Sequence, residues 1–148
     1  MGQSYVQLVT RFYDLMEKPG WGVMSVFGSE TTPPFSYTIG LWQNYAHPEI
    51  IVLGLPQQAA HAILNIVARR VKDGEAFGYD CAYDQIAANY PARFRPAPSD
   101  NGYYFGMAKR VYGKPFEARQ LVWTDKHGHF PWETEYSLSP ILQTMQSS

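Results

Sequence analysis

The run EIIVLGL at residues 49–55 is the feature that most constrains the fold. Its side chains are apolar at successive positions, so a strand built from it presents apolar groups on both faces. Such a strand lies inside a sheet and needs cover on both sides. Pro56 follows it, and apolar residues then recur at helical spacing as far as Gly74. The chain is therefore expected to fold around a central strand and a helix packed against it.

Other segments with regular patterns surround this unit. Apolar residues from Val6 to Met16 have the spacing of one helical face, and Pro19-Gly20 ends the pattern. Residues 21–27 and 35–41 are rich in aromatic and β-branched residues and flank a turn-forming segment, which predicts an antiparallel hairpin. The further expectations are strands at 77–83 and 116–123, a loop at 94–102, a helix at 103–112 capped by Asp100 or Asn101, a turn at 125–128 that returns through residues 130–132, and a short helix at 139–146. This order predicts the α+β class, with a mainly antiparallel sheet and helices packed on one face.

Composition narrows the classes of protein. A chain of 148 residues that is 45% hydrophobic predicts one domain over residues 1–148. Its net charge of −1 disfavours a grip on duplex nucleic acid. Cys81 is the one cysteine, so an internal disulfide and a cysteine zinc site are excluded and a cytoplasmic location is expected. The opening residues fit neither a signal peptide nor a membrane span.

Two stretches combine aromatic side chains with a histidine and a carboxylate. The first is YTIGLW at 37–42 with HPE at 47–49, and the second is QLVWTD at 120–125 with KHGHFPWE at 126–133. The combination resembles the bacterial and phage family of domain of unknown function 4262. The resemblance implies a small intracellular bacterial or viral protein, and it supplies no activity, cofactor or catalytic residue.

Four residues of these stretches are candidates for acid–base catalysis. His47 with Glu49, or Asp125 with His127, would supply a base and the group that orients it. In the structural alternative, His47 caps a loop and Asp125 closes a turn. The same spacings allow a metal site from His127 with His129 or from His47 with Glu49, but they are common by chance. We expect no metal and no cofactor.

Aromatic residues make up 16% of the chain, which fits a binding pocket, an aromatic core or a subunit interface. Arg93 and Arg95 flank Phe94 and are better candidates for binding an anion than Arg69 and Arg70, whose place at the end of a helix explains them. The leading hypothesis is a homo-oligomeric protein that holds a planar or phosphorylated, nucleotide-type molecule and sequesters or senses it. Its candidate binding residues are Tyr37, Thr38, Trp42, Arg93, Arg95, Gln120, Trp123 and Trp132. The alternatives are a hydrolase or phosphodiesterase that uses the catalytic candidates, and an adaptor that docks a partner through residues 126–132.

Overall fold

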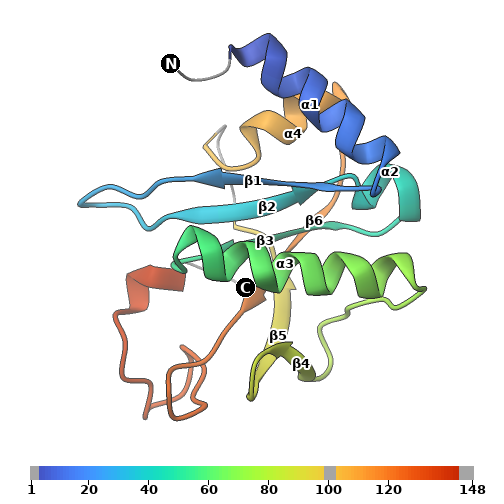
Figure 1. Cartoon of the computed structure of the whole chain (residues 1–148). Coiled ribbons are helices and arrows are strands. Elements are labelled where there is room, and N and C mark those ends of the chain that lie inside the picture. Colours follow the sequence, from blue (N-terminus) through green and yellow to red (C-terminus); the bar gives the residue numbers. More distant parts are fainter. Residues whose placement is uncertain (1–3, 99–102, 144–148) are drawn as a thin grey trace.

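A single six-stranded sheet organises the computed structural model, which describes residues 4–98 and 103–143 (Figure 1). The strand order is β1-β2-β3-β6-β5-β4. The strands are β1 (Gly22–Val26), β2 (Phe35–Ile39), β3 (Glu49–Leu53), β4 (Tyr83–Ala87), β5 (Tyr90–Pro96) and β6 (Ala118–Val122). β3 and β6 pair in parallel, and the other neighbouring strands pair antiparallel. The predicted α+β class and mainly antiparallel sheet are confirmed.

The helices are α1 (Tyr5–Glu17), α2 (Leu41–Tyr45), α3 (Gln57–Lys72), α4 (Gly106–Tyr112) and the 3₁₀ turn η1 (Pro140–Gln143). Ser4 starts α1 with a reciprocal capping box to Gln7. Helix α4 begins after Phe105, which is in the left-handed conformation. The expected caps Asp100 and Asn101 lie outside the described residues, as do the last residues of the helix expected at 139–146. Among the described residues, no helix has the length and apolar character that a membrane span needs.

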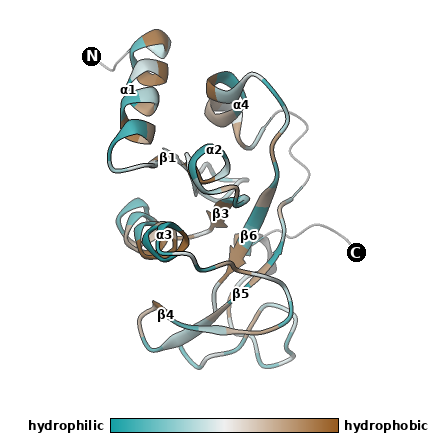
Figure 2. Cartoon of the chain, turned by 90° about the vertical axis from the view of Figure 1, so that its right-hand side faces the viewer, coloured by the Kyte–Doolittle hydropathy of each residue, from teal (hydrophilic) through white to brown (hydrophobic). Residues whose placement is uncertain are grey.

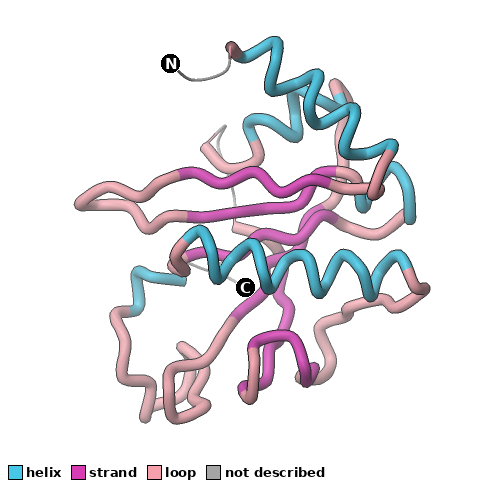
Figure 3. Tube along the Cα trace, in the orientation of Figure 1, coloured by secondary structure: helices cyan, strands magenta, loops and turns pink. Residues whose placement is uncertain are grey.

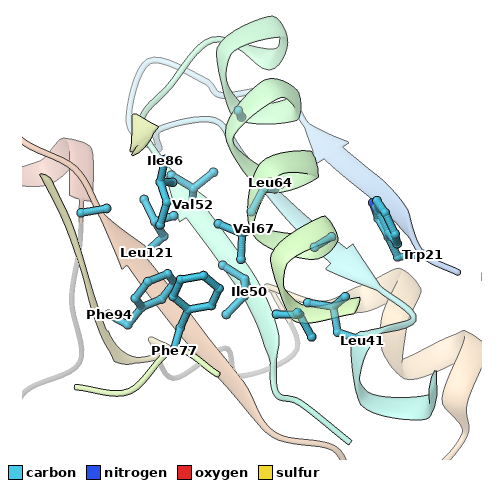
Figure 4. Packing of buried hydrophobic residues seen from close by; sticks show 14 residues of the cluster. Trp21, Leu41, Ile50, Val52, Leu64, Val67, Phe77, Ile86, Phe94 and Leu121 are labelled. Atoms are coloured by element: carbon cyan, nitrogen blue, oxygen red, sulfur yellow. The ribbon is translucent and has the colours of Figure 1, made fainter. Parts of the chain in front are cut away.

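Helices cover both faces of the sheet, so the expectation of a single covered face is wrong (Figures 1 and 2). Ile50 and Val52 pack against Leu64 and Val67 of α3, on the face shown in Figure 4. On the opposite face, Ile51 and Leu53 pack with residues of α1 and α4 that include Phe12, Met16 and Met107. The physical reason lies in β3 itself, because its four consecutive apolar residues at 50–53 point alternately to both faces, and neither face is stable in water.

The region between α3 and α4 differs most from expectation. Residues 77–82 form no strand, and the hairpin of β4 and β5 follows them instead. Strand β5 covers part of the segment that was expected to be a loop. That expectation came from the prolines of the stretch at 94–102, of which Pro96 lies at the end of the strand. Phe94 nevertheless points into the core while Arg93 and Arg95 remain half-buried, which is the alternation of an ordinary strand.

A long loop without strands occupies residues 123–139 (Figure 3). The return strand expected at 130–132 is therefore absent from the described chain. A backbone hydrogen bond from Asp125 N to His129 O closes the turn, and η1 follows at the end of the loop.

Candidate functional site

Glu49 is fully buried at the start of β3, beside the first turn of α2. Its carboxylate accepts hydrogen bonds from the backbone N–H groups of Gly40, Leu41 and Trp42 at 3.0, 3.3 and 3.1 Å. These N–H groups belong to a helix that has no capping side chain of its own. Glu49 therefore caps α2 from a neighbouring strand, which places a negative charge at the positive end of the helix.

Two hydroxyl groups complete the surroundings of Glu49. Thr38 Oγ1 donates at 2.7 Å and itself accepts from Ile50 N at 2.9 Å, and Tyr112 donates a short hydrogen bond to Glu49 Oε2. Burial raises the pKa of the Glu49 carboxyl, against the opposing effect of these hydrogen bonds. Burial and the adjacent Glu49 also raise the pKa of Tyr112, so its hydroxyl keeps its proton and remains a donor. We call Thr38, Gly40, Glu49 and Tyr112 the Glu49 cluster.

Gly40 is required in this cluster by its backbone. Its φ is +130°, and an added Cβ would lie 2.5 Å from Gly20 O and 2.8 Å from Trp21 Cα. A side chain at this position would push α2 away from the loop before β1. The YTIGL and HPE stretches thus meet in space, and together they build a structural cap.

His47 is also fully engaged by the protein. Its Nε2 accepts from Phe77 N at 3.1 Å, and its Nδ1 lies 2.8 Å from Pro48 O, so this pairing assigns the proton to Nδ1. Burial lowers the pKa of His47, Pro48 O opposes this shift and Arg119 adds to it. The imidazole is therefore held neutral, with both nitrogens occupied.

Asp125 organises the long loop in a similar way. Oδ1 accepts from the N–H groups of His127 and His129 at 2.9 and 3.0 Å, and Oδ2 accepts from Ser137 N and Oγ at 2.9 and 3.0 Å. Burial raises the pKa of Asp125, but hydrogen bonds from His129, Ser137 and His127 outweigh it, and the pKa lies well below its usual value. Asp125 and His127 line a hollow of about 650 Å³ under the loop, where the Asp125 oxygens are already occupied.

The four catalytic candidates do not form one site. Glu49 pairs with Ala118 at the start of the parallel β3–β6 ladder. From Ala118 to Val122, strand β6 runs ~13 Å at about 3.3 Å per residue, and Asp125 comes after its far end. His47 and Glu49 therefore lie at one end of the strand pair, and Asp125 and His127 lie at the other. Catalytic partners need hydrogen-bond reach, so this arrangement does not support the acid–base hypothesis.

Three of the predicted binding residues do come together. A groove of about 430 Å³ is lined by Arg93, Arg95 and Trp132 with Tyr79, Phe94 and Pro96. The Arg95 guanidinium lies 5.2 Å from the centre of the Trp132 ring, and Arg119 lies 5.0 Å from the centre of the Tyr79 ring. We call this hollow the arginine groove.

The other predicted binding residues lie elsewhere. Tyr37 and Thr38 are buried, and Tyr37 OH accepts from Met107 N at 2.9 Å. Trp42 lies on α2 beside Glu49. Trp123 ties η1 to the sheet through Gln143 and donates from Nε1 to Leu53 O.

Gln120 is also fully buried, and neither of its amide atoms has a hydrogen-bond partner in the described structure. It pairs with Arg95 across the β5–β6 ladder, so the two side chains leave the same face of the sheet. A buried amide without partners lies directly beside a residue of the arginine groove.

Sequence reasoning missed Tyr79, Arg119 and Tyr112. Tyr79 lies in the segment mistaken for a strand, and Tyr112 reaches Glu49 from 63 residues away. Arg119 lies in β6 next to Gln120, and the side chains of neighbouring strand residues point to opposite faces of the sheet. This alternation was the one sequence signal that could have indicated a role for Arg119. Their roles depend on contacts that local patterns do not encode.

The sequence matches the family described as domain of unknown function DUF4262 over residues 15–137. The chain belongs to the DUF4262 family. The region matched to DUF4262 includes the Glu49 cluster, the arginine groove and most of the loop organised by Asp125. No curated protein and no solved structure gives a significant match to the chain.

Proposed function

We propose that the arginine groove binds a small molecule that combines a planar ring with an anionic group, as a nucleotide does, and that the protein sequesters or senses this molecule. The observation that carries the proposal is the pairing of arginine with an exposed aromatic ring at two of the groove's walls. Trp132 and Tyr79 are each 43% exposed, with Arg95 and Arg119 above their rings.

The charge of the groove favours an anion. No carboxylate is among its lining residues. Arg93 makes one long hydrogen bond, from Nη2 to Tyr79 O at 3.4 Å, and within the described chain neither Arg93 nor Arg95 forms an ion pair. One guanidinium group can donate two parallel hydrogen bonds to two oxygens of a phosphate or carboxylate. Arginines that form no ion pair and line a concave surface are therefore suited to bind such an anion.

The aromatic walls favour a flat partner. The Trp132 ring stacks on Phe130 at 4.8 Å with an interplanar angle of 8°, which holds the indole in place. A base or similar ring can stack on the Arg95 guanidinium, or it can displace the guanidinium and stack on the Trp132 indole. Each stacked base contributes about 1–3 kcal/mol to the binding free energy. Binding is favoured over turnover because His47, Glu49 and Asp125 use their polar atoms within the protein.

Calorimetric titration with the four ribonucleoside monophosphates, the matching nucleosides and inorganic phosphate tests this proposal. We expect at least one monophosphate to bind, with its nucleoside and phosphate at least tenfold weaker. Arg95→Ala and Trp132→Ala should each weaken binding at least tenfold. Arg110→Ala is the matched control, because Arg110 also lies over an exposed ring, that of Tyr5, but outside the groove.

Full affinity in both groove variants would refute the proposal, as would no binding of any monophosphate at millimolar concentration. Native mass spectrometry of the purified protein adds the subunit number and any retained molecule. Conversion of a bound nucleotide during incubation would instead support the hydrolase alternative.

A further inference from the structure

Three side chains of the long loop converge on a point outside the arginine groove. His129, Glu133 and Glu135 each offer one ligand atom, and these atoms all lie within 4.8 Å of one another. His129 and Glu133 are half-buried and Glu135 is exposed, so an ion from solvent can reach them. We propose that these residues form a site for a divalent cation of the zinc type.

One ring nitrogen of His129, Nδ1, is buried without a hydrogen-bond partner in the described chain. The nearest carboxylate oxygen, Asp125 Oδ2, is 3.7 Å away and already accepts from Ser137 N and Oγ. A polar atom of this kind costs free energy unless an ion, a water molecule or a moved side chain pairs with it.

The charge of the cluster also favours a cation. Glu133 and Glu135 form no ion pair with any lysine or arginine that the structure describes. One oxygen of Glu135 accepts from Thr134 Oγ1 at 2.7 Å, which leaves the other available. Two carboxylates close together repel each other, and a divalent ion between them removes that repulsion.

The backbone holds the cluster in place. His129 is fixed on both sides by Asp125, through His129 N to Oδ1 at 3.0 Å and Asp125 N to His129 O at 2.9 Å. Glu133 N donates to Phe130 O at 2.9 Å, which sets the turn that carries the first glutamate. In a tetrahedral zinc site the ligand atoms lie about 3.3 Å apart, and rotation of the glutamate side chains can close the remaining distance.

The ligand set indicates the class of ion. One imidazole with two carboxylates suits Zn²⁺ and its neighbours among the transition metals, whereas Mg²⁺ and Ca²⁺ prefer oxygen ligands alone. Three protein ligands leave a position for water or for a ligand anion. The site needs no nucleotide, so its test is independent of the arginine groove.

Equilibrium dialysis of the purified full chain against Zn²⁺, in excess Mg²⁺, tests the site, with bound metal measured by elemental mass spectrometry. We expect one Zn²⁺ per chain, and at least a tenfold loss of affinity in His129→Ala and in Glu133→Gln. His127→Ala is the matched control, because His127 is two residues away and outside the cluster, with ring centres 6.3 Å apart. Circular dichroism confirms that each variant is folded.

Three results would overturn the proposal. The first is the absence of saturable Zn²⁺ binding by the wild-type chain. The second is an equal loss of affinity in His127→Ala, which would assign the metal to the histidine pair. The third is retained binding in Glu133→Gln and in Glu135→Gln, which would exclude the carboxylates as ligands.

Discussion

The two ends of the β3–β6 strand pair carry similar side chains in opposite states. At the Glu49 end, the carboxylate, the His47 imidazole and the Tyr112 hydroxyl all have partners within the protein. At the far end, Asp125 is equally well paired, but His129 Nδ1 lacks a partner and Glu133 has no ion pair in the described chain. Arg93 and Arg95 line the arginine groove, which extends along β5 from Arg93, the partner of Val122, to Pro96, the partner of Arg119.

This difference shows that residue type alone does not identify a functional site. A histidine beside a carboxylate occurs at both ends of the pair. What each end can bind depends on which of its polar atoms still lack a partner once the protein's own hydrogen bonds are formed. Within the described chain, the polar atoms of Glu49 and His47 are occupied by hydrogen bonds, whereas Arg93, Arg95 and Glu133 form no ion pair.

Removal of the Glu49 carboxylate should give the largest effect. Glu49→Ala removes an acceptor shared by three backbone N–H groups and two hydroxyls, of which Gly40 N also donates to the Tyr112 hydroxyl at 3.0 Å. We expect a loss of about 3–5 kcal/mol in the free energy of unfolding. Urea denaturation followed by circular dichroism measures it, and Glu49→Gln, which keeps one acceptor oxygen, should lose less. A loss below about 1 kcal/mol would contradict the structural role.

Asp125→Ala should act locally. The change removes the acceptor for His127, His129 and Ser137, so the loop at 123–139 should open while the sheet persists. We expect faster cleavage within this loop by a protease, with a circular dichroism spectrum close to that of the wild type. Global unfolding would show instead that the two ends are equally important for the fold.

Replacement of the unpaired Gln120 amide should have the opposite sign. Gln120→Leu removes two buried polar atoms that have no partner among the described residues, and we expect the free energy of unfolding to rise by about 1–2 kcal/mol. The urea midpoint measures this change. A destabilised variant would mean that the amide is paired in solution, for example by water, and would reduce the contrast between the two ends.

The smallest effect concerns pH at the Glu49 end. Burial lowers the pKa of His47 in the folded chain, so protonation favours the unfolded chain. The contribution of His47 to stability is complete above the unfolded value of about 6.5 and declines as pH falls below it, toward the lowered folded value. Urea midpoints at pH 7.5 and 5.5 should differ less in His47→Gln than in the wild type. An unchanged difference in His47→Gln would exclude His47 as its source.

Sequence patterns predicted the elements whose character is local. The apolar run of β3 and the helical stripe of α3 were recognisable because the spacing of apolar residues along the sequence predicts which side chains are buried. Strand β5 was partly missed because its prolines imitate a loop. Helix α2 was missed because Glu49 caps it from another strand.

The candidate sites divide in the same way. Arg93 and Arg95 were identified from their position beside Phe94, and Trp132 was also predicted, but Tyr79 was missed because it lies in the segment mistaken for a strand. The proposed metal ligands Glu133 and Glu135 were not singled out, because the sequence spacing paired His129 with its nearer neighbour His127.

The sequence by itself determined a central strand covered on both faces, a long helix beside it and the α+β class, since these follow from the periodic burial of apolar side chains. Tertiary structure alone decided which polar side chains are occupied by hydrogen bonds within the protein and which remain free to bind a ligand. Hydrogen bonds are directional and short, so the fate of Glu49, His47 and Arg95 depended on groups that only the folded chain brings within about 3 Å.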